Sequence, residues 1–237
     1  MRATDWEFKN RALIFGLIFG CSFAGYSFDP QNSTAALANW LGAVLGIDST
    51  LLARLLFACA AGLLAVAALT RTWASSYLHS SVVYAEAVKT DSLVADGPYR
   101  HVRNPLYFAN VLLALGMGAM MSRTGFFVGV AAMLAFCYRL IFREESELSA
   151  AQGELFERYQ NTVPRLWPAA RPRVAVAGRQ AKWAEGFRAE FWCWGFVIAV
   201  AAFAITLNTT AFFLILAASI AALWWFTSLT NRRARRD

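Results

Sequence analysis

The stretch from Asp96 to Tyr107 gathers turn formers, cations and hydrogen-bonding side chains directly before a long apolar run. Its first residues, Asp-Gly-Pro, favour a turn, because Gly accepts a positive φ and Pro fixes its own φ. Asn104 is suited to cap a helix, and Pro105 suits the first turn, where a missing N–H costs nothing. Since no charge occurs from Pro105 to Met121, we expect a membrane helix to begin at Pro105 with its free N–H groups at the aqueous side.

Three side chains that can carry positive charge, Arg100, His101 and Arg103, stand just ahead of this helix. An anionic group beside them would be stabilised by their charges and by the positive end of the helix dipole. The stretch is therefore typical of a binding site at a membrane surface.

An acidic cluster that includes Glu144 and Glu145 follows the next apolar run. The two runs are joined only by Ser122-Arg123-Thr124, so they must form an antiparallel pair. The residues before one run and after the other then meet at the same membrane face. The predicted pocket contains Tyr99, Arg100, His101, Arg103, Asn104 and Tyr107 from one side and Glu144, Glu145 and Glu147 from the other.

Such a pocket suits S-adenosylmethionine, which carries a sulfonium, an ammonium, a carboxylate, a ribose diol and an adenine. Carboxylates bind the diol or the ammonium, cations bind the carboxylate, and a Tyr ring lies against the adenine or near the sulfonium. A phosphate-bearing cofactor would also be attracted by the cations. Methyl transfer depends mainly on positioning and needs no covalent nucleophile. For an amine or hydroxyl acceptor, the candidate general bases are Glu144, Glu145 and His101.

The chain resembles the isoprenylcysteine carboxyl methyltransferase and phospholipid methyltransferase families in two motifs. Members of these families read Gly-Pro-Tyr, three residues, then Arg-His-Pro-x-Tyr, and this chain has Asn104 where most members have His. The second motif is Glu144-Glu145-Ser146-Glu147-Leu148, then Gln152-Gly153, Phe156, Tyr159 and Val163-Pro164-Arg165. The resemblance covers roughly Arg71 to Pro168.

The resemblance implies an integral membrane methyltransferase that uses S-adenosylmethionine. The expected cofactor-binding residues are Tyr99, Arg103, Asn104, Pro105, Tyr107, Glu144 and Glu145, and the expected catalytic residues are Arg165, near the acceptor, and His101. Asn104 donates and accepts hydrogen bonds but cannot carry a proton as His does. The expected acceptor is a lipid or another lipophilic small molecule, such as an isoprenylated cysteine carboxylate or a phospholipid amine.

The composition indicates an integral membrane protein. The chain of 237 residues is 58% hydrophobic and only 16% charged, whereas soluble proteins average about a quarter charged residues. In a chain this apolar, the net charge of +7 favours cytoplasmic-loop bias and lipid contacts over nucleic-acid binding. The four Cys lie in apolar segments without CxxC spacing, and only two His occur, so neither a disulfide framework nor a metal site is indicated.

We expect an all-α membrane protein, a bundle of about six transmembrane helices with a cytoplasmic cofactor-binding region. The expected spans are 12–28, 51–70, 105–121, 125–142, 191–207 and 211–229. The apolar piece 35–47 is too short for a typical span, so we interpret it as an interfacial or re-entrant helix, with a short true span as the alternative. The helix after residue 142 is expected to continue beyond the membrane or to break near Gly153.

The charge distribution orients this bundle. One side holds only Asp29, Asp48, Arg54 and Arg123 in or beside its loops. Because most other Lys and Arg lie on the opposite side, both termini and both motifs are predicted to be cytoplasmic. We divide the chain into N-terminal transmembrane helices (1–70), a methyltransferase core (71–168) and a C-terminal basic segment with a helical hairpin (169–237).

Two other functions fit the sequence less well. Sterol-reductase-like membrane proteins are similar in the second motif, so an NADPH-dependent membrane reductase is the main alternative. A non-catalytic scaffold or transporter is the other, although the expected spans lack paired charges at mid-membrane. Short pieces with strand propensity at 82–84 and 93–94 suggest a hairpin over the site.

Overall fold

The computed structural model describes residues 2–78 and 94–233, and within these ranges the regular elements are helices, with an isolated bridge between Asn32 and Ser122. The first elements are α1 (Asp5–Lys9), α2 (Arg11–Ala24), η1 (Gly25–Ser27), α3 (Ser33–Leu45) and α4 (Ser49–Tyr77). They are followed by η2 (Gly97–Arg100), α6 (Pro105–Gly118), α7 (Arg123–Gln152), α8 (Glu154–Thr162), α9 (Trp183–Thr206) and α10 (Thr209–Arg233). The predicted hairpin at 82–84 and 93–94 depends on residues outside the described ranges.

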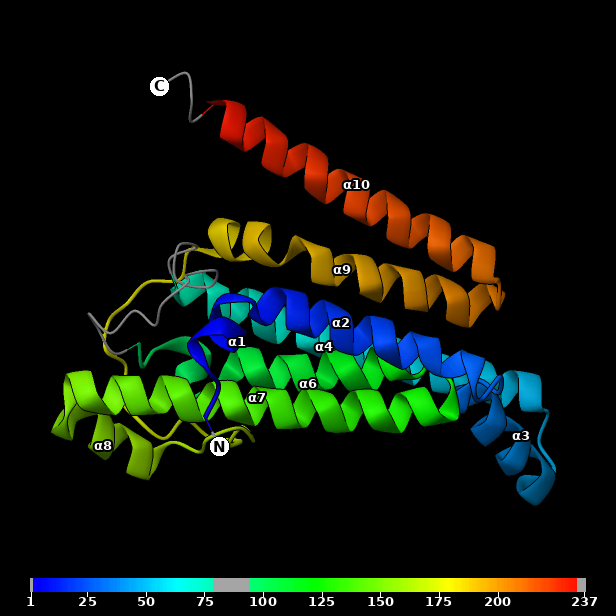
Figure 1. The fold of residues 1–237 in the computed structure, drawn as a ribbon, viewed down its shortest axis with the longest axis horizontal. Coiled ribbons are helices and arrows are strands. Elements are labelled where there is room, and N and C mark those ends of the chain that lie inside the picture. The colour runs from blue at the N-terminus through cyan, green and yellow to red at the C-terminus, as the bar shows by residue number, and fades with distance from the viewer. Residues whose placement is uncertain (1, 79–93, 234–237) are drawn as a thin grey trace.

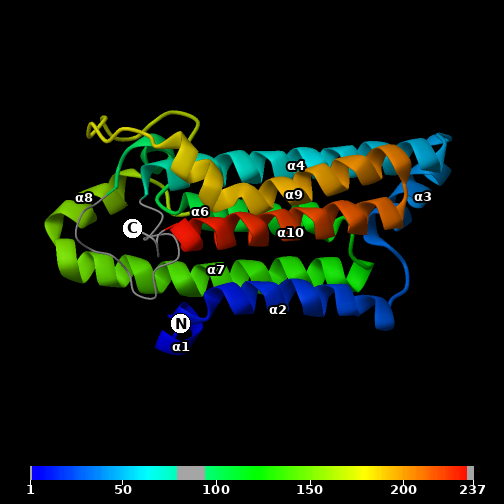
Figure 2. The same cartoon turned by 90° about the horizontal axis from the view of Figure 1, so that it is seen from above.

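The long axis of the molecule is followed by α2, α4, α6, α7, α9 and α10 (Figure 1). Within the bundle, α4 packs on both α6 and α9. α6 and α2 each pack on α7, and α9 packs on α10. The short helix α3 lies at one end of the bundle, whereas α1, η2 and α8 lie toward the other end (Figures 1 and 2). The two motifs are therefore at the end of the bundle opposite α3.

Three of the described helices, α4, α7 and α9, are long and apolar enough to cross a membrane. Shorter apolar helices are Arg11–Ser27, Ser33–Leu45, Pro105–Gly118 and Thr209–Ser219. The prediction of an all-helical chain with membrane-crossing helices is confirmed to this extent.

The helical hairpin that carries both motifs has the predicted form. α6 begins at Pro105, and Ser122 caps α7 by accepting a hydrogen bond from the N–H of Gly125. α7 continues past residue 142 to Gln152. The chain then breaks at Gly153, whose φ of +52° and ψ of −127° suit glycine, and resumes as α8. The predicted interruption near Gly153 is confirmed.

Two helices extend beyond their predicted limits. α4 continues seven residues past Thr70 to Tyr77, and α9 begins at Trp183, eight residues before Phe191. Arg71 and Glu190 therefore lie inside helices, and the boundary after residue 70 falls within α4. The division into three parts otherwise stays a prediction.

Two of the three buried apolar clusters in the described residues share α6, and the third lies around α8. One cluster joins α4, α6, α9 and the start of α10, and the other joins α1, α2, α6 and α7. Figure 2 shows α6 between α4 and α7. Because α6 is covered on both sides, its uncharged composition reflects burial in protein rather than lipid contact alone.

Candidate functional site

The turn ahead of α6 is fixed by close packing and by backbone hydrogen bonds. Gly97 has a φ of +58°, and a Cβ there would lie 2.3 Å from the ring of Tyr77, so only glycine fits. The carboxylate of Asp96 accepts hydrogen bonds of 2.7 Å from the N–H groups of Ala177 and Arg179. This carboxylate therefore attaches the later loop to the first motif.

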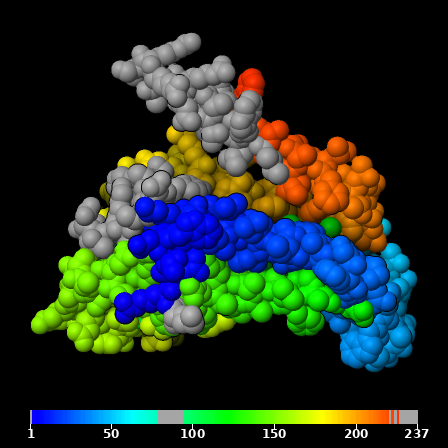
Figure 3. Space-filling view, in the orientation of Figure 1, coloured from blue at the N-terminus to red at the C-terminus, as the bar shows by residue number. Residues whose placement is uncertain are grey.

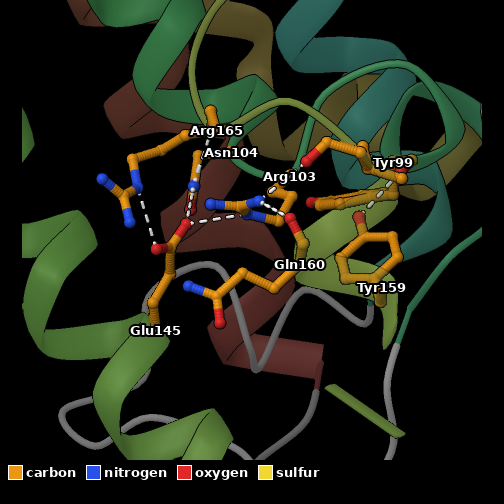
Figure 4. A network of polar contacts seen from close by, with 8 residues as sticks. Tyr99, Arg103, Asn104, Glu145, Tyr159, Gln160 and Arg165 are labelled. Atoms are coloured by element: carbon orange, nitrogen blue, oxygen red, sulfur yellow. Dashed lines mark hydrogen bonds and ion pairs between the residues drawn. The ribbon is translucent and has the colours of Figure 1, made fainter. Parts of the chain in front are cut away.

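Glu145 is the centre of a polar network that joins both motifs (Figure 4). Its Oε1 accepts hydrogen bonds of 3.0 Å from Arg103 Nε and from Asn104 Nδ2. Its Oε2 accepts a hydrogen bond of 2.9 Å from Arg165 Nε. The predicted convergence of the segment before α6 with the acidic segment of α7 is therefore present in the structure.

Asn104 occupies the N-cap position of α6, but its side chain makes no capping hydrogen bond. Its Nδ2 instead donates to Glu145 Oε1 and, at 3.0 Å, to the carbonyl oxygen of Arg165. The predicted N-cap position of Asn104 is therefore confirmed, but its side chain joins α6 to α7 and does not cap the helix.

The last turn of α8 and the residue after it enclose this network. Arg103 Nη1 donates to the carbonyl oxygens of Gln160 and Val163, the latter at 2.7 Å. Tyr159 Oη donates to the carbonyl oxygen of Tyr99 at 2.7 Å. Burial raises the pKa of Tyr99 well above its usual value, so this phenol stays protonated and available as a donor at neutral pH.

Tyr107 and Glu144 form a second link between α6 and α7. Tyr107 Oη donates a hydrogen bond of 2.5 Å to Glu144 Oε1. Both side chains line the same cavity, so this pair places a carboxylate and a phenol on its wall.

The cavity has a volume of about 710 Å³ and joins a polar end to an apolar arm. The polar end includes Tyr99, Arg103, Asn104, Pro105, Tyr107, Glu144, Glu145 and Tyr159. The apolar arm is lined by side chains of α2, α6, α9 and α10, among them Phe19, Phe23, Met117, Phe196, Phe212 and Leu216. Figure 3 shows a furrow between α2 and α10 on this face of the molecule.

The two predicted catalytic residues lie outside the lining of this cavity. Arg165 donates to Glu145, and its guanidinium carbon lies 4.9 Å from the centre of the Phe142 ring. The Nδ1 of His101 lies 2.9 Å from the carbonyl oxygen of Ala169. A catalytic role at Arg165 or His101 stays a prediction, and the contacts of Arg165 fit a residue that holds Glu145 in place.

Three residues that were not expected in the site, Arg11, Arg71 and Asn110, also line the cavity. Arg71 forms an ion pair with Glu190, and both residues lie just outside the expected spans 51–70 and 191–207. The sequence did contain one signal for Arg71, which is an Arg directly after an apolar run. Where a membrane helix continues through such a position, the charged residue is a candidate functional residue.

In the part of the chain that the structure describes, no group of three or more His, Cys, Asp or Glu is placed to hold a metal ion.

The chain is similar to two proteins whose names refer to metal resistance. It is 29% identical over 124 residues to the cobalt-zinc-cadmium resistance protein CzcN of Cupriavidus metallidurans, which is 52% of each chain. It is 31% identical over 108 residues to the nickel-cobalt-cadmium resistance protein NccN of Alcaligenes xylosoxydans xylosoxydans, covering 46% of this chain and 51% of that protein. The chain thus spans about half the length of these curated relatives.

No solved structure matches the chain. Residues 55–154 match the phospholipid methyltransferase family, and this segment contains α6, α7, Arg103, Asn104 and Glu145, whereas α8 after its first residue and Arg165 lie outside it. The resemblance seen in the motifs is therefore confirmed as a match of residues 55–154 to the phospholipid methyltransferase family.

Proposed function

We propose that this protein is an integral membrane methyltransferase that uses S-adenosylmethionine and methylates a lipophilic acceptor. The observation that carries the proposal is the single cavity with a polar end at the two motifs and an apolar arm between the long helices. The match of residues 55–154 to the phospholipid methyltransferase family supports methyl transfer. The two parts of the cavity fit a small charged methyl donor at the polar end and an apolar methyl acceptor in the arm.

The residues of the polar end fit S-adenosylmethionine by their chemistry. Glu144 offers a carboxylate for a ribose diol or an ammonium group, and Arg103 contributes positive charge. The rings of Tyr99 and Tyr107 offer aromatic surface to an adenine or a sulfonium. When bound, the cofactor supplies a methyl group on a positively charged sulfur, and the electrons of the broken S–C bond stay on that sulfur.

The residues of the chain position the cofactor and the acceptor and exclude water from them. Glu145 accepts hydrogen bonds from Arg103, Asn104 and Arg165, so it fixes the wall of the polar end. Glu144, held by Tyr107, is the carboxylate that this wall presents. Preorganisation of this kind lowers the entropic cost of aligning the acceptor with the methyl group.

We further propose six membrane crossings, by α2, α4, α6, α7, α9 and α10, with α3 at the outer interface. The α3 end carries few charges, and two of them, Asp29 and Arg123, pair with each other at 3.0 Å. The opposite end carries most Lys and Arg. The positive-inside tendency then places the site and both termini on the cytoplasmic side. The acceptor would reach the arm laterally from the bilayer, between α2 and α10.

Isothermal titration of the purified full chain with S-adenosylhomocysteine tests the cofactor. We expect saturable binding, and we expect Glu144→Gln to weaken it by about tenfold, which corresponds to about 1.4 kcal/mol. Glu147→Gln is the matched control, because Glu147 bonds with Arg143 at 2.8 Å and does not line the cavity. Absence of binding at millimolar S-adenosylhomocysteine would contradict the proposal.

The same titration with NADPH separates the main alternative. A membrane reductase would bind NADPH in preference to S-adenosylhomocysteine. The proposed methyltransferase binds S-adenosylhomocysteine and shows no saturable NADPH binding.

A further inference from the structure

A strongly basic segment lies between α8 and α9. From residue 158 to residue 184 the sequence contains six Arg and Lys residues and no Asp or Glu. We name residues 169–182 the strap, because this part of the chain hydrogen-bonds with η2 and with the end of α4. Figure 2 shows it in yellow, projecting past α4 at the end of the bundle that carries the motifs. A segment with charges of one sign favours a partner of the opposite charge.

Backbone hydrogen bonds hold the strap on the bundle. The N–H of Arg173 donates to the carbonyl oxygen of Arg100 at 2.8 Å, and the N–H of Lys182 donates to that of Ser76 at 2.8 Å. Between these two points, the Asp96 carboxylate accepts two hydrogen bonds from the strap. All of these bonds use N–H groups of the backbone, so they do not neutralise the positive charges of the strap.

Three exposed cations of this region have no counter-charge in the described ranges of the chain. Arg171 and Arg173 lie in the strap, and Arg188 lies on the second turn of α9. None of the three forms an ion pair with another described residue. Lys182 is exposed as well and pairs with Glu185 at 3.2 Å. The protein therefore presents a positive surface here, which ions or an anionic partner must neutralise.

Exposed apolar side chains lie among these cations. Val176 is 66% exposed, Trp183 is 56% exposed and Phe187 is 45% exposed. Trp183 and Phe187 are four residues apart on α9, so they lie on the same face of that helix. Aromatic side chains next to cations are typical of segments that lie in the interface of a bilayer. This combination favours a membrane surface over an acidic soluble protein as the partner.

Two long apolar helices place the strap at the level of the lipid headgroups. α9 begins directly after Lys182, and at about 1.5 Å per residue Phe187 lies about 7.5 Å further along its axis. On α4, Val66 and Leu69 are exposed, and Ser76, which the strap contacts, lies about 10 Å beyond Leu69. The polar layer on each side of a bilayer is about 5–8 Å thick. Both helices therefore bring the strap to the outer edge of this layer.

We propose that the strap, together with Arg188, docks on the headgroups of anionic phospholipids on the side of the bilayer that carries the site. Guanidinium groups bind phosphate oxygens through paired hydrogen bonds. The strap lies beyond residue 154, outside the segment that matches the phospholipid methyltransferase family. The proposal requires that α4 and α9 cross the membrane, for which both are long and apolar enough, and it does not depend on the cofactor or on the reaction.

The test measures which lipid lies next to the strap. The full chain carries Val176→Cys for attachment of a fluorescent dye, and Cys21→Ser and Cys59→Ser to remove the two exposed native thiols. It is reconstituted in vesicles of phosphatidylcholine and phosphatidylglycerol in equal amounts. A nitroxide quencher on the acyl chain is placed on one lipid or on the other, so the headgroup composition is the same in both samples.

We expect phosphatidylglycerol to be the preferred neighbour of the dye, with a relative affinity at least about fivefold above that of phosphatidylcholine at low salt. Equal quenching by the two lipids would overturn the proposal. An absence of quenching by either lipid would also overturn it, because Val176 would then lie away from the bilayer, as expected for a surface that binds a soluble partner.

The variant Arg171→Gln/Arg173→Gln/Arg188→Gln removes the three unpaired cations. We expect the preference for phosphatidylglycerol to fall to within about twofold of none. The matched control, Arg2→Gln/Lys9→Gln/Arg158→Gln, removes three exposed cations at the same end of the bundle, and its preference should stay within about twofold of the wild type. An equal fall in both variants would show an effect of net charge alone and would refute a specific role of the strap.

Ionic strength tests the same contact without any change to the cations. At about 1 M salt the screening length falls to about 3 Å, so the preference for phosphatidylglycerol should largely disappear in the labelled chain. The quenching by both lipids together should persist, since the apolar side chains still hold the strap at the interface. A preference that is independent of salt would contradict a contact between the strap and charged headgroups.

Discussion

Asn104 donates a hydrogen bond to Glu145, a residue 41 positions later, and so joins the start of α6 to the second half of α7. Glu145 is 6% exposed and Asn104 is 9% exposed, so this bond is made away from bulk water. Most members of the resembling families have His at the position of Asn104. The structure shows that the Asn side chain meets the carboxylate as a hydrogen-bond donor, a task that a neutral His could also perform.

Asn104→His is therefore expected to retain the link to Glu145, whereas Asn104→Leu is expected to lose it. A hydrogen bond to a charged group contributes about 1.5–3 kcal/mol, and the Leu variant also leaves the carbonyl of Arg165 without this donor. Thermal unfolding in detergent should show a lower melting temperature for Asn104→Leu than for Asn104→His. Equal melting temperatures would show that the bond contributes little.

Arg165→Ala is expected to reduce cofactor affinity through Glu145 rather than through direct contact. Its guanidinium donates to Glu145 but does not line the cavity. The side chain is 36% exposed, so the loss should be modest, about 1 kcal/mol or about fivefold in affinity for S-adenosylhomocysteine. Arg165→Lys should restore part of it. A complete loss of turnover with unchanged S-adenosylhomocysteine affinity would instead support the catalytic role predicted from the sequence.

Gly16→Phe is expected to occupy the apolar arm. Gly16 lines the cavity, and a Cβ at this position would meet no atom within 4 Å. The new ring should exclude long-chain acceptors and leave S-adenosylhomocysteine binding unchanged. Gly20→Phe on the same helix is the control, because a Cβ there also meets nothing within 4 Å and Gly20 does not line the cavity. Comparable long-chain binding by the two variants would argue against this arm as the acceptor site.

The pair of Asp29 and Arg123 predicts an acid-sensitive contact at the α3 end. The hydrogen bond from Arg123 lowers the pKa of Asp29 from its usual value of 3.8 to about 2. A carboxyl whose pKa is lower in the folded state than in the unfolded state stabilises the folded state at pH values above its unfolded-state pKa. This contribution is lost as pH falls from about 4 to about 2. The wild-type melting temperature should therefore fall more steeply over this range than that of Asp29→Asn. Parallel curves of melting temperature against pH for the wild type and Asp29→Asn would contradict a stabilising pair of Asp29 and Arg123.

The sequence predicted the features that depend on local signals and on topology. Pro105 marked the start of α6, Gly153 marked the break after α7, and the short connection around Arg123 required an antiparallel pair. From these elements alone the meeting of the two motifs followed. The precise partners did not follow, because Glu145 could have faced water or ligand instead of Arg103 and Arg165.

The part of the site that sequence reasoning missed depends on contacts between distant segments. Arg71 and Glu190 are separated by 119 positions. Each lies next to an apolar run, and each was expected to end up outside the membrane helices, at the aqueous side. α4 and α9 continue through these positions, and the two charges form an ion pair in the interior. A hydropathy profile does not detect a pairing of this kind, because it scores each charged residue separately.

The separation of Arg71 from Glu190 has a consequence for biosynthesis. A ribosome that adds about 5–20 residues per second needs roughly 6–24 s to translate the 119 positions between them. During that interval α4, α6 and α7 have been made while the guanidinium of Arg71 still lacks its counter-charge. The nascent chain therefore passes through a stage in which Arg71 is not yet paired with Glu190, and the docking of α9 is the event that forms this ion pair.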